Sequence, residues 1–157
     1  MSLADDILAA ARAANATVTC AESCTGGMVA AAITDVAGSS AIFERGFVTY
    51  SNQAKTDMLG VRPARLDAFG AVSEEVARDM AEGALRAAGA NVAVSISGIA
   101  GPGGSEFKPE GRVCFALASA TGTTSETIEF GAPGRAEVRR SARDHALTLI
   151  LRKLRQI

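Results

Sequence analysis

Short β-rich runs alternate with segments of helical periodicity along this chain of 157 residues. Apolar residues three or four apart predict helices, and compact apolar or alternating runs predict strands. The predicted helices cover residues 3–14, 23–36, 52–59, the segment from Ser73 to Gly89, and a long final segment that opens at Pro133. The predicted strands cover residues 17–21, 42–50, 91–96, 113–118 and 124–130. This order predicts a single domain over residues 1–157, an α/β fold built as a three-layer α/β/α sandwich with a mixed sheet of about five strands.

Start and stop signals support several of these boundaries. Ser2 and Asp5 are typical of a helix start, and Ser73 is followed by two glutamates that favour the positive end of a helix dipole. Gly60 is placed to close the helix over 52–59. Three segments are predicted to be loop, turn or irregular structure: residues 62–72, the Gly/Pro-rich stretch 98–111, and the hairpin turn 121–123.

Composition limits both the core and the class of partner. Hydrophobic residues make up 48% of the chain and aromatic residues only 4%, so the core must consist mainly of Ala, Val, Ile and Leu. A net charge of -1 gives no electrostatic reason to expect nucleic acid or a membrane surface as a partner. Three cysteines without a Cys-x-x-Cys pair, and a single histidine, predict neither a disulfide framework nor a metal site. Without a recognisable signal peptide or bilayer-spanning run, a cytoplasmic protein is expected.

Ser23 lies at the junction between the first predicted strand and the helix that follows it. The first backbone N–H groups of a helix lack partners, and those of Thr25 and Gly26 could stabilise an oxyanion. Gly26 and Gly27 are poor helix formers, but they allow a ligand or another backbone to approach closely. Two alternatives stay open: Ser23 could simply cap the helix, and Cys24 is a rival nucleophile, although no cationic neighbour in sequence favours its thiolate.

Lys55 is the candidate base for a serine nucleophile in a chain with one histidine. A lysine acts as a base only when it is neutral, so burial or a nearby cation must lower its pKa from about 10.4. Tyr50, the only tyrosine, is placed to relay a proton or to orient the lysine. The alternative is a solvated surface lysine, because lysines are seldom buried.

A glycine-rich segment from Ser97 to Ser105 follows the predicted strand over 91–96. The N–H groups of Gly98, Gly101 and Gly103 could face a phosphate or a carboxylate. The segment is not a Walker loop, because no Gly-Lys-Ser/Thr ends it. It is not a Rossmann fingerprint either, because a strand is predicted to follow it. A plain tight turn is the alternative.

Three arginines, Arg135, Arg139 and Arg143, recur every four residues along one face of the final predicted helix. A solvated face is one interpretation, and a phosphate clamp or a subunit contact is the other. The single histidine, His145, lies beside the apolar stripe of that helix, where a packing role is typical. A Ser-His-Asp triad is therefore not predicted.

Four motifs resemble the CinA C-terminal domain family, in the family's order and with its approximate spacing. They are Ala-Glu-Ser-Cys-Thr-Gly-Gly at residues 21–27 and the segments 46–55, 70–73 and 97–104. The resemblance covers essentially the whole chain, and several members of the family are nicotinamide-nucleotide amidohydrolases. It implies hydrolysis of the carboxamide of nicotinamide mononucleotide to nicotinate mononucleotide and ammonia, without a metal or other cofactor. It also implies a compact α/β/α sandwich that assembles as a homodimer or higher homo-oligomer.

The resemblance further implies particular site residues. The family's catalytic serine, tyrosine and lysine carry over to Ser23, Tyr50 and Lys55. Ser97 stands where the family often has threonine, and Arg139 matches a basic position that is a candidate substrate contact. Two other functions stay open: a nucleotide-binding or regulatory module without turnover, and an amidase for a different small amide.

Overall fold

Six α-helices and five strands make up the computed structural model, which describes residues 2–105 and 107–157. The helices are α1 (Leu3–Ala14), α2 (Met28–Thr34), α3 (Asn52–Leu59), α4 (Pro63–Phe69), α5 (Glu74–Ala88) and α6 (Arg135–Leu154). The strands are β1 (Val18–Glu22), β2 (Phe47–Val48), β3 (Val92–Gly98), β4 (Arg112–Ser119) and β5 (Gly122–Glu129). A short 3-10 helix, η1, covers Ser39–Ala41.

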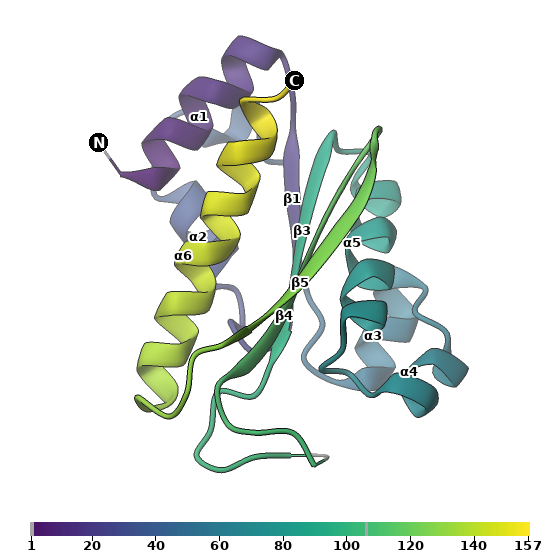
Figure 1. The fold of residues 1–157 in the computed structure, drawn as a ribbon. Helices are drawn as coiled ribbons and strands as arrows, with labels where there is room; N and C mark the ends of the chain where they lie inside the picture. The colour runs from purple at the N-terminus through teal and green to yellow at the C-terminus, as the bar shows by residue number, and fades with distance from the viewer. Residues whose placement is uncertain (1, 106) are drawn as a thin grey trace.

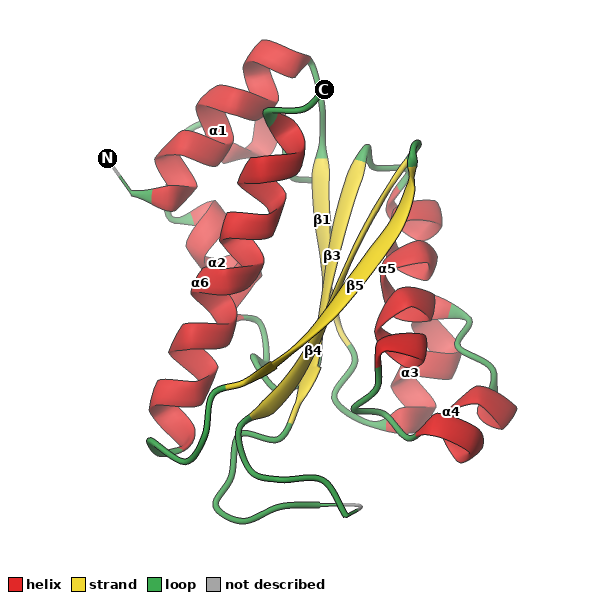
Figure 2. Cartoon of the chain, in the orientation of Figure 1, coloured by secondary structure: helices red, strands yellow, loops and turns green. Residues whose placement is uncertain are grey.

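The five strands form one mixed sheet in the order β2-β1-β3-β4-β5. β1 pairs in parallel with β2 and β3, and β4 pairs antiparallel with β3 and β5. Helices α1, α2 and α6 cover one face of the sheet and α3, α4 and α5 cover the other (Figure 1, Figure 2). The predicted three-layer α/β/α sandwich is therefore confirmed, and so is the hairpin made by the last two strands.

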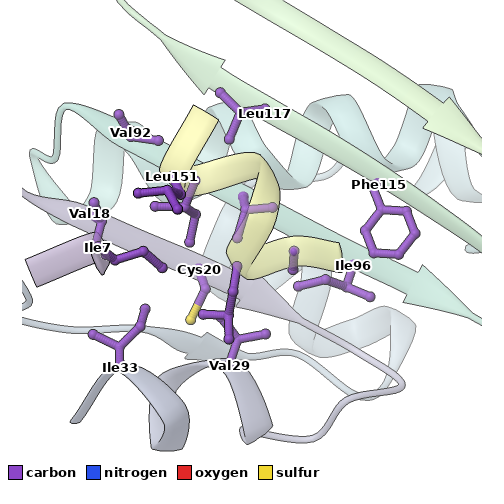
Figure 3. Close-up of a cluster of buried hydrophobic side chains, with 14 of the residues drawn as sticks. Ile7, Val18, Cys20, Val29, Ile33, Val92, Ile96, Phe115, Leu117 and Leu151 are labelled. Atoms are coloured by element: carbon purple, nitrogen blue, oxygen red, sulfur yellow. The ribbon is translucent and has the colours of Figure 1, made fainter. Parts of the chain in front are cut away.

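Alternation along the central strands divides the core into two clusters. On the side of α1, α2 and α6, large apolar side chains such as Val92, Ile96 and Phe115 pack against the helices (Figure 3). The side chains between them point to α5 and are small: Ala93, Ser95, Ala116 and Ala118. Because small side chains occupy little depth, α5 packs close to the sheet on that face.

Local signals place α1, α3 and α5 where the sequence predicts them. The Ser2 side chain caps α1, and Asp5 completes the capping box. The Ser73 side chain caps α5 by accepting a hydrogen bond from the Val76 N–H. Gly60 and Gly89 end α3 and α5 in the left-handed conformation, with φ of 73° and 60°.

Two predicted boundaries around β1 are wrong. The helix expected over 23–36 begins only at Met28, because Gly26 and Gly27 take positive φ values of 57° and 108° and break the helical path. The strand expected over 42–50 is reduced to β2. Upstream of β2, the segment meets β1 through single contacts, such as the Thr19 hydroxyl donating to the Arg45 carbonyl at 2.7 Å, instead of a ladder.

The segment predicted as irregular over 62–72 contains α4. Pro63 occupies the first turn, Leu66 is buried against the α5 side of the core, and Gly70 follows the last residue. The remaining differences are small. The predicted loop over 98–111 lies between β3 and β4, and its residue 106 lies outside the described residues. The hairpin turn is 120–121 instead of 121–123. The final helix, α6, begins at Arg135 instead of Pro133.

Gly83 sets the distance between α3 and α5, and alanine at this position should destabilise the fold. A Cβ added to Gly83 would lie 2.0 Å from the carbonyl oxygen of Leu59, the last residue of α3. Backbone atoms cannot yield as a side chain does, so Gly83→Ala is expected to lower the free energy of unfolding by about 1–3 kcal/mol. Helix propensity alone predicts the opposite sign, a gain of about 1 kcal/mol.

Urea unfolding followed by circular dichroism measures this effect. The matched variant is Ala87→Gly at an exposed position of α5, which reports the propensity difference without a close contact. A Gly83→Ala protein that is more stable than the wild type would contradict the close approach of α3 and α5.

Candidate active site

The carboxyl ends of the three parallel strands meet at one edge of the sheet. Ser23 follows β1, Thr49 follows β2 and Ser97 is the second-last residue of β3. The Ser23 N–H donates to the Ile96 carbonyl at 2.9 Å, and the Thr49 N–H donates to the Glu22 carbonyl at 2.8 Å. Ligands of open α/β sheets bind outside this edge, so the strands place these residues where a site is expected.

Lys55 reaches Ser23 from the first turn of α3. The Ser51 side chain caps this helix, and Lys55 and Leu59, four residues apart, form its buried side. Lys55 Nζ donates to Ser23 Oγ at 3.1 Å and to the Thr49 carbonyl at 2.9 Å. Lys55 is 1% exposed and Ser23 is 9% exposed. The structure thus brings the predicted serine and lysine into contact, and the alternative of a solvated lysine is wrong.

Burial changes the protonation of Lys55. Removal from water disfavours the ammonium form and lowers the pKa of Lys55 from 10.5 to about 8, while the nearby Cys24 thiol opposes this effect. With a pKa near 8, about a tenth of the lysine is neutral at pH 7. A neutral amine within hydrogen-bond distance of a hydroxyl can accept its proton.

Cys24 lies beside the same cavity as Ser23 but is a poor nucleophile. Burial raises the pKa of its thiol to about 11, and this effect outweighs the charges of Arg139 and Lys55 nearby. Since the thiolate is the reactive form, a thiol that stays protonated is weakly nucleophilic. Burial of the Cys24 thiol and the hydrogen bond from Lys55 to Ser23 therefore favour Ser23 as the nucleophile.

Tyr50 points away from the serine–lysine contact. Its side chain is 61% exposed, and its hydroxyl accepts a hydrogen bond from Arg135 Nη2 at 3.0 Å. Lys55 Nζ meets the Tyr50 backbone carbonyl at 3.5 Å instead of the phenol. In this structure Tyr50 does not hold the relay position predicted for it, although it still lines the cavity.

A cavity of about 340 Å³ opens above the contact between Ser23 and Lys55. The glycine-rich loop forms one wall, where Ser97, Gly98, Gly101 and Gly103 line the cavity. The lining continues with residues of the β2–α3 segment, the 71–72 segment and the start of α6: Tyr50, Asn52, Ala71, Val72 and Arg135.

Internal hydrogen bonds shape the loop wall. The Ser97 hydroxyl donates to the Ala71 carbonyl at 2.8 Å, which ties β3 to the segment before α5. The Gly103 N–H donates to Glu110 Oε1 at 2.6 Å, so this predicted donor already has a partner. Arg135 Nη1 donates to the Gly101 carbonyl at 2.8 Å. Arg135 therefore joins the glycine-rich loop to Tyr50 at the cavity.

Four predicted site residues stand outside the cavity lining. The Gly26 N–H donates to the Ser23 carbonyl at 3.0 Å and the Gly27 N–H donates to Glu22 Oε1 at 3.2 Å, so neither is a free oxyanion donor. The other two are Thr25, which is buried, and Arg139, which binds backbone carbonyls of the serine turn. The capping alternative for Ser23 is also wrong, since Gly27 occupies the N-cap of α2.

Sequence reasoning missed the role of Glu22 and did not single out Arg135 among the three arginines of the final helix. Glu22 is fully buried and its carboxylate accepts hydrogen bonds from the first turn of α2; its place in the 21–27 motif was the available signal. Arg135 lines the cavity, whereas Arg143, on the same predicted face, pairs with Asp144 elsewhere on α6. Spacing showed that the arginines share a face but could not show which of them reaches the site.

Two further classes of feature are absent from residues 2–105 and 107–157. No group of three or more His, Cys, Asp or Glu side chains is arranged to hold a metal ion there. Across the same ranges, no helix has both the length and the apolar character needed to cross a membrane.

Comparison with known sequences gives a family-level match along nearly the whole chain. Residues 1–154 match the family described as CinA C-terminal domain. The nicotinamide-nucleotide amidohydrolase PncC of Escherichia coli (strain K12) is 56% identical over 157 residues, covering 99% of this chain and 95% of that protein. This relative is therefore similar in length as well as in sequence.

Solved structures agree with the observed fold. A competence/damage inducible protein, CihA, from Agrobacterium tumefaciens is 46% identical with a TM-score of 0.92, over 98% of this chain and 93% of that one. A CinA-superfamily protein from Klebsiella pneumoniae is 36% identical with a TM-score of 0.94, over 99% of this chain and 97% of that one. The arrangement of helices around the mixed sheet is thus shared with these proteins.

Proposed function

The chain belongs to the CinA C-terminal domain family, and from that premise we propose that it hydrolyses the carboxamide of nicotinamide mononucleotide to nicotinate mononucleotide and ammonia. Near full-length similarity to a protein named nicotinamide-nucleotide amidohydrolase supports the reaction. The observation that carries the mechanism is the hydrogen bond from buried Lys55 to Ser23 at the carboxyl edge of the sheet. It supplies a nucleophile and a base in contact.

The proposed reaction begins with a proton transfer. Neutral Lys55 takes the proton from Ser23 Oγ, and the oxygen attacks the carboxamide carbon. The Thr49 carbonyl, 2.9 Å from Nζ, stabilises the ammonium that results. The ammonium then returns its proton to the leaving nitrogen, ammonia departs, and water hydrolyses the acyl-enzyme with the lysine again as base.

The negative oxygen of the tetrahedral intermediate needs hydrogen-bond donors. The Thr25 N–H, one of the predicted donors, donates to no other group within residues 2–105 and 107–157. The Gly26 N–H, predicted for the same role, is engaged with the Ser23 carbonyl. Thr25 is fully buried and lies outside the cavity lining, so neither predicted N–H group faces the substrate space.

The direct test is a product assay on the purified chain. Nicotinamide mononucleotide should yield equal amounts of ammonia and nicotinate mononucleotide. Calorimetric binding of the nucleotide with no ammonia would favour the nucleotide-binding module. Release of ammonia from an unrelated small amide, but not from the nucleotide, would favour an amidase of different specificity.

Arg135 is the proposed contact for the 5′-phosphate, because its guanidinium lines the cavity beside the glycine-rich loop. Loss of a charge-assisted hydrogen bond costs about 1.5–3 kcal/mol, so Arg135→Gln should raise KM for nicotinamide mononucleotide by about 10- to 100-fold with a smaller effect on kcat. Steady-state kinetics with the nucleotide and with nicotinamide riboside, which lacks the phosphate, measure this effect.

The matched control is Arg140→Gln, an exposed arginine of α6 that pairs with Glu137. Its kinetic constants should equal those of the wild type. If Arg135→Gln lowers kcat/KM equally for the phosphorylated and the unphosphorylated compound, Arg135 does not read the phosphate.

We extend the proposal to the organisation of the protein. Residues 1–157 would act as one amidohydrolase domain within a homodimer or higher homo-oligomer, as the resemblance implies. Light scattering on the purified chain measures the number of copies.

A further inference from the structure

Arg139 holds the turn that carries Ser23 by its backbone carbonyls. Its Nε donates to the Cys24 carbonyl at 3.0 Å, and its Nη2 donates to the Thr25 carbonyl at 3.3 Å. A Cβ on Gly26 would lie only 3.2 Å from Nη2, so the glycine leaves the space that the guanidinium occupies. Two donors of one rigid planar group thus fix two consecutive peptide units.

Glu22 holds the same turn by its donors. Its fully buried carboxylate accepts the Thr25 hydroxyl at 2.6 Å and the N–H groups of Gly27, Val29 and Ala30 at 3.0–3.2 Å. Within residues 2–105 and 107–157 no ion pair neutralises this carboxylate, so these donors supply its stabilisation. The Arg139 guanidinium therefore binds carbonyl groups of the turn between β1 and α2, and the Glu22 carboxylate binds hydrogen-bond donors of the same turn.

The contact with Arg139 fixes the orientation of the peptide unit that joins Cys24 to Thr25. In a trans peptide unit, the C=O and the N–H point in opposite directions. Because the Cys24 carbonyl points to Arg139, the Thr25 N–H points away from the guanidinium. Arg139 is not among the residues that line the cavity, whereas Ser23 and Cys24 are. The guanidinium thus lies behind the turn instead of in the substrate space.

We infer that Arg139 is a positioning residue, which fixes the turn that carries Ser23 through the Cys24 and Thr25 carbonyls and does not bind substrate. This inference rests on the proposed function for the identity of the reaction. It replaces the expectation that Arg139 contacts the substrate. A lysine at this position keeps the charge but offers a single point donor in place of the planar pair.

The kinetic test separates positioning from binding. Arg139→Lys and Arg139→Ala should each lower kcat for nicotinamide mononucleotide on the order of 100-fold, the effect of a misplaced nucleophile, with little change in KM. Millimolar guanidinium should restore part of the activity of Arg139→Ala, whereas sodium chloride at equal ionic strength should not. Arg143→Lys, one turn along α6 and paired with Asp144, is the matched control.

A second readout works without the nucleotide. A small fluorophosphonate, which carries no nicotinamide and no ribose phosphate, should label Ser23, and the labelling rate should fall in both Arg139 variants but not in Arg143→Lys. Labelling of the wild type without hydrolysis of nicotinamide mononucleotide would refute the proposed substrate, and the labelling rates would then decide the role of Arg139.

Three results would overturn the inference. The first is a raised KM with unchanged kcat, which would make Arg139 a substrate contact. The second is a loss of thermal stability with unchanged kcat per folded molecule, which would make its role structural only. The third is a wild-type protein that neither hydrolyses the nucleotide nor reacts at Ser23, which would remove the reaction that Arg139 is inferred to serve.

Discussion

The Ser23→Ala variant is expected to release ammonia from nicotinamide mononucleotide at least about 10⁴-fold more slowly than the wild type. Without Oγ no acyl-enzyme can form, and the nearest other nucleophile, the Cys24 thiol, stays protonated because burial raises its pKa to about 11. The cavity itself is unchanged by the loss of one hydroxyl. The variant should therefore still bind the nucleotide, which calorimetry can measure beside a coupled ammonia assay.

Cys24→Ala is the matched control for Ser23→Ala. It removes a side chain of similar size from the adjacent position and from the same cavity wall. Its rate should stay within about tenfold of the wild type, a loss that reflects packing beside the nucleophile and not chemistry. If Cys24→Ala were the inactive variant and Ser23→Ala the active one, the roles proposed for the two residues would have to be exchanged.

The fold could be predicted from the sequence mainly where local signals and tertiary packing agree. α1 and α5 carry a capping serine, a buried stripe and a stop signal, and both lie close to their predicted ranges. β2 could not be foreseen as a two-residue strand, because its length depends on how far the neighbouring segment follows β1. α4 was missed since it is too short to show periodicity, although Pro63 and Gly70 mark its ends.

The candidate site was predictable in its residues more than in its contacts. Ser23 and Lys55 were selected by chemistry and by the family resemblance, but their separation of 32 positions left the hydrogen bond between them to the tertiary structure. For Arg139 the sequence pointed to the substrate, whereas the structure places its guanidinium on the serine turn and Arg135 at the cavity. One turn of helix separates the two arginines, and Arg135, the first residue of α6, is the one that lines the cavity.

The Lys55→Met variant should lose the dependence of stability on pH that buried Lys55 gives the wild type. Below pH 8 the lysine is charged in both the folded and the unfolded chain, and the folded state carries the cost of burying that charge. Between about pH 8 and 10.5 the folded chain holds the neutral amine while the unfolded chain still binds a proton, so the free energy of unfolding rises with pH. The shift from 10.5 to about 8 corresponds to a rise of about 3 kcal/mol.

Urea unfolding at a series of pH values measures this difference. The wild type should gain stability relative to Lys55→Met as the pH increases through this range, and no gain should appear below pH 7. Lys153→Met, at a lysine that contacts Thr121 far from the cavity, is the matched control and should follow the wild-type curve. Parallel curves for the wild type and Lys55→Met would contradict a buried lysine with a lowered pKa.

The same proton should appear in the kinetics, because Lys55 must be neutral to accept the proton of Ser23. In the wild type, kcat/KM, which reports the free enzyme, should rise tenfold per pH unit at low pH and level off above about pH 8. Lys55→Met should lose at least about 10³-fold in rate, and its residual activity should not show this inflection.

If stability and kcat/KM both change slope near pH 8, one group controls both, and the contact with Ser23 identifies it as the base. If only the stability curve bends, Lys55 titrates in the folded protein but does not act on the serine.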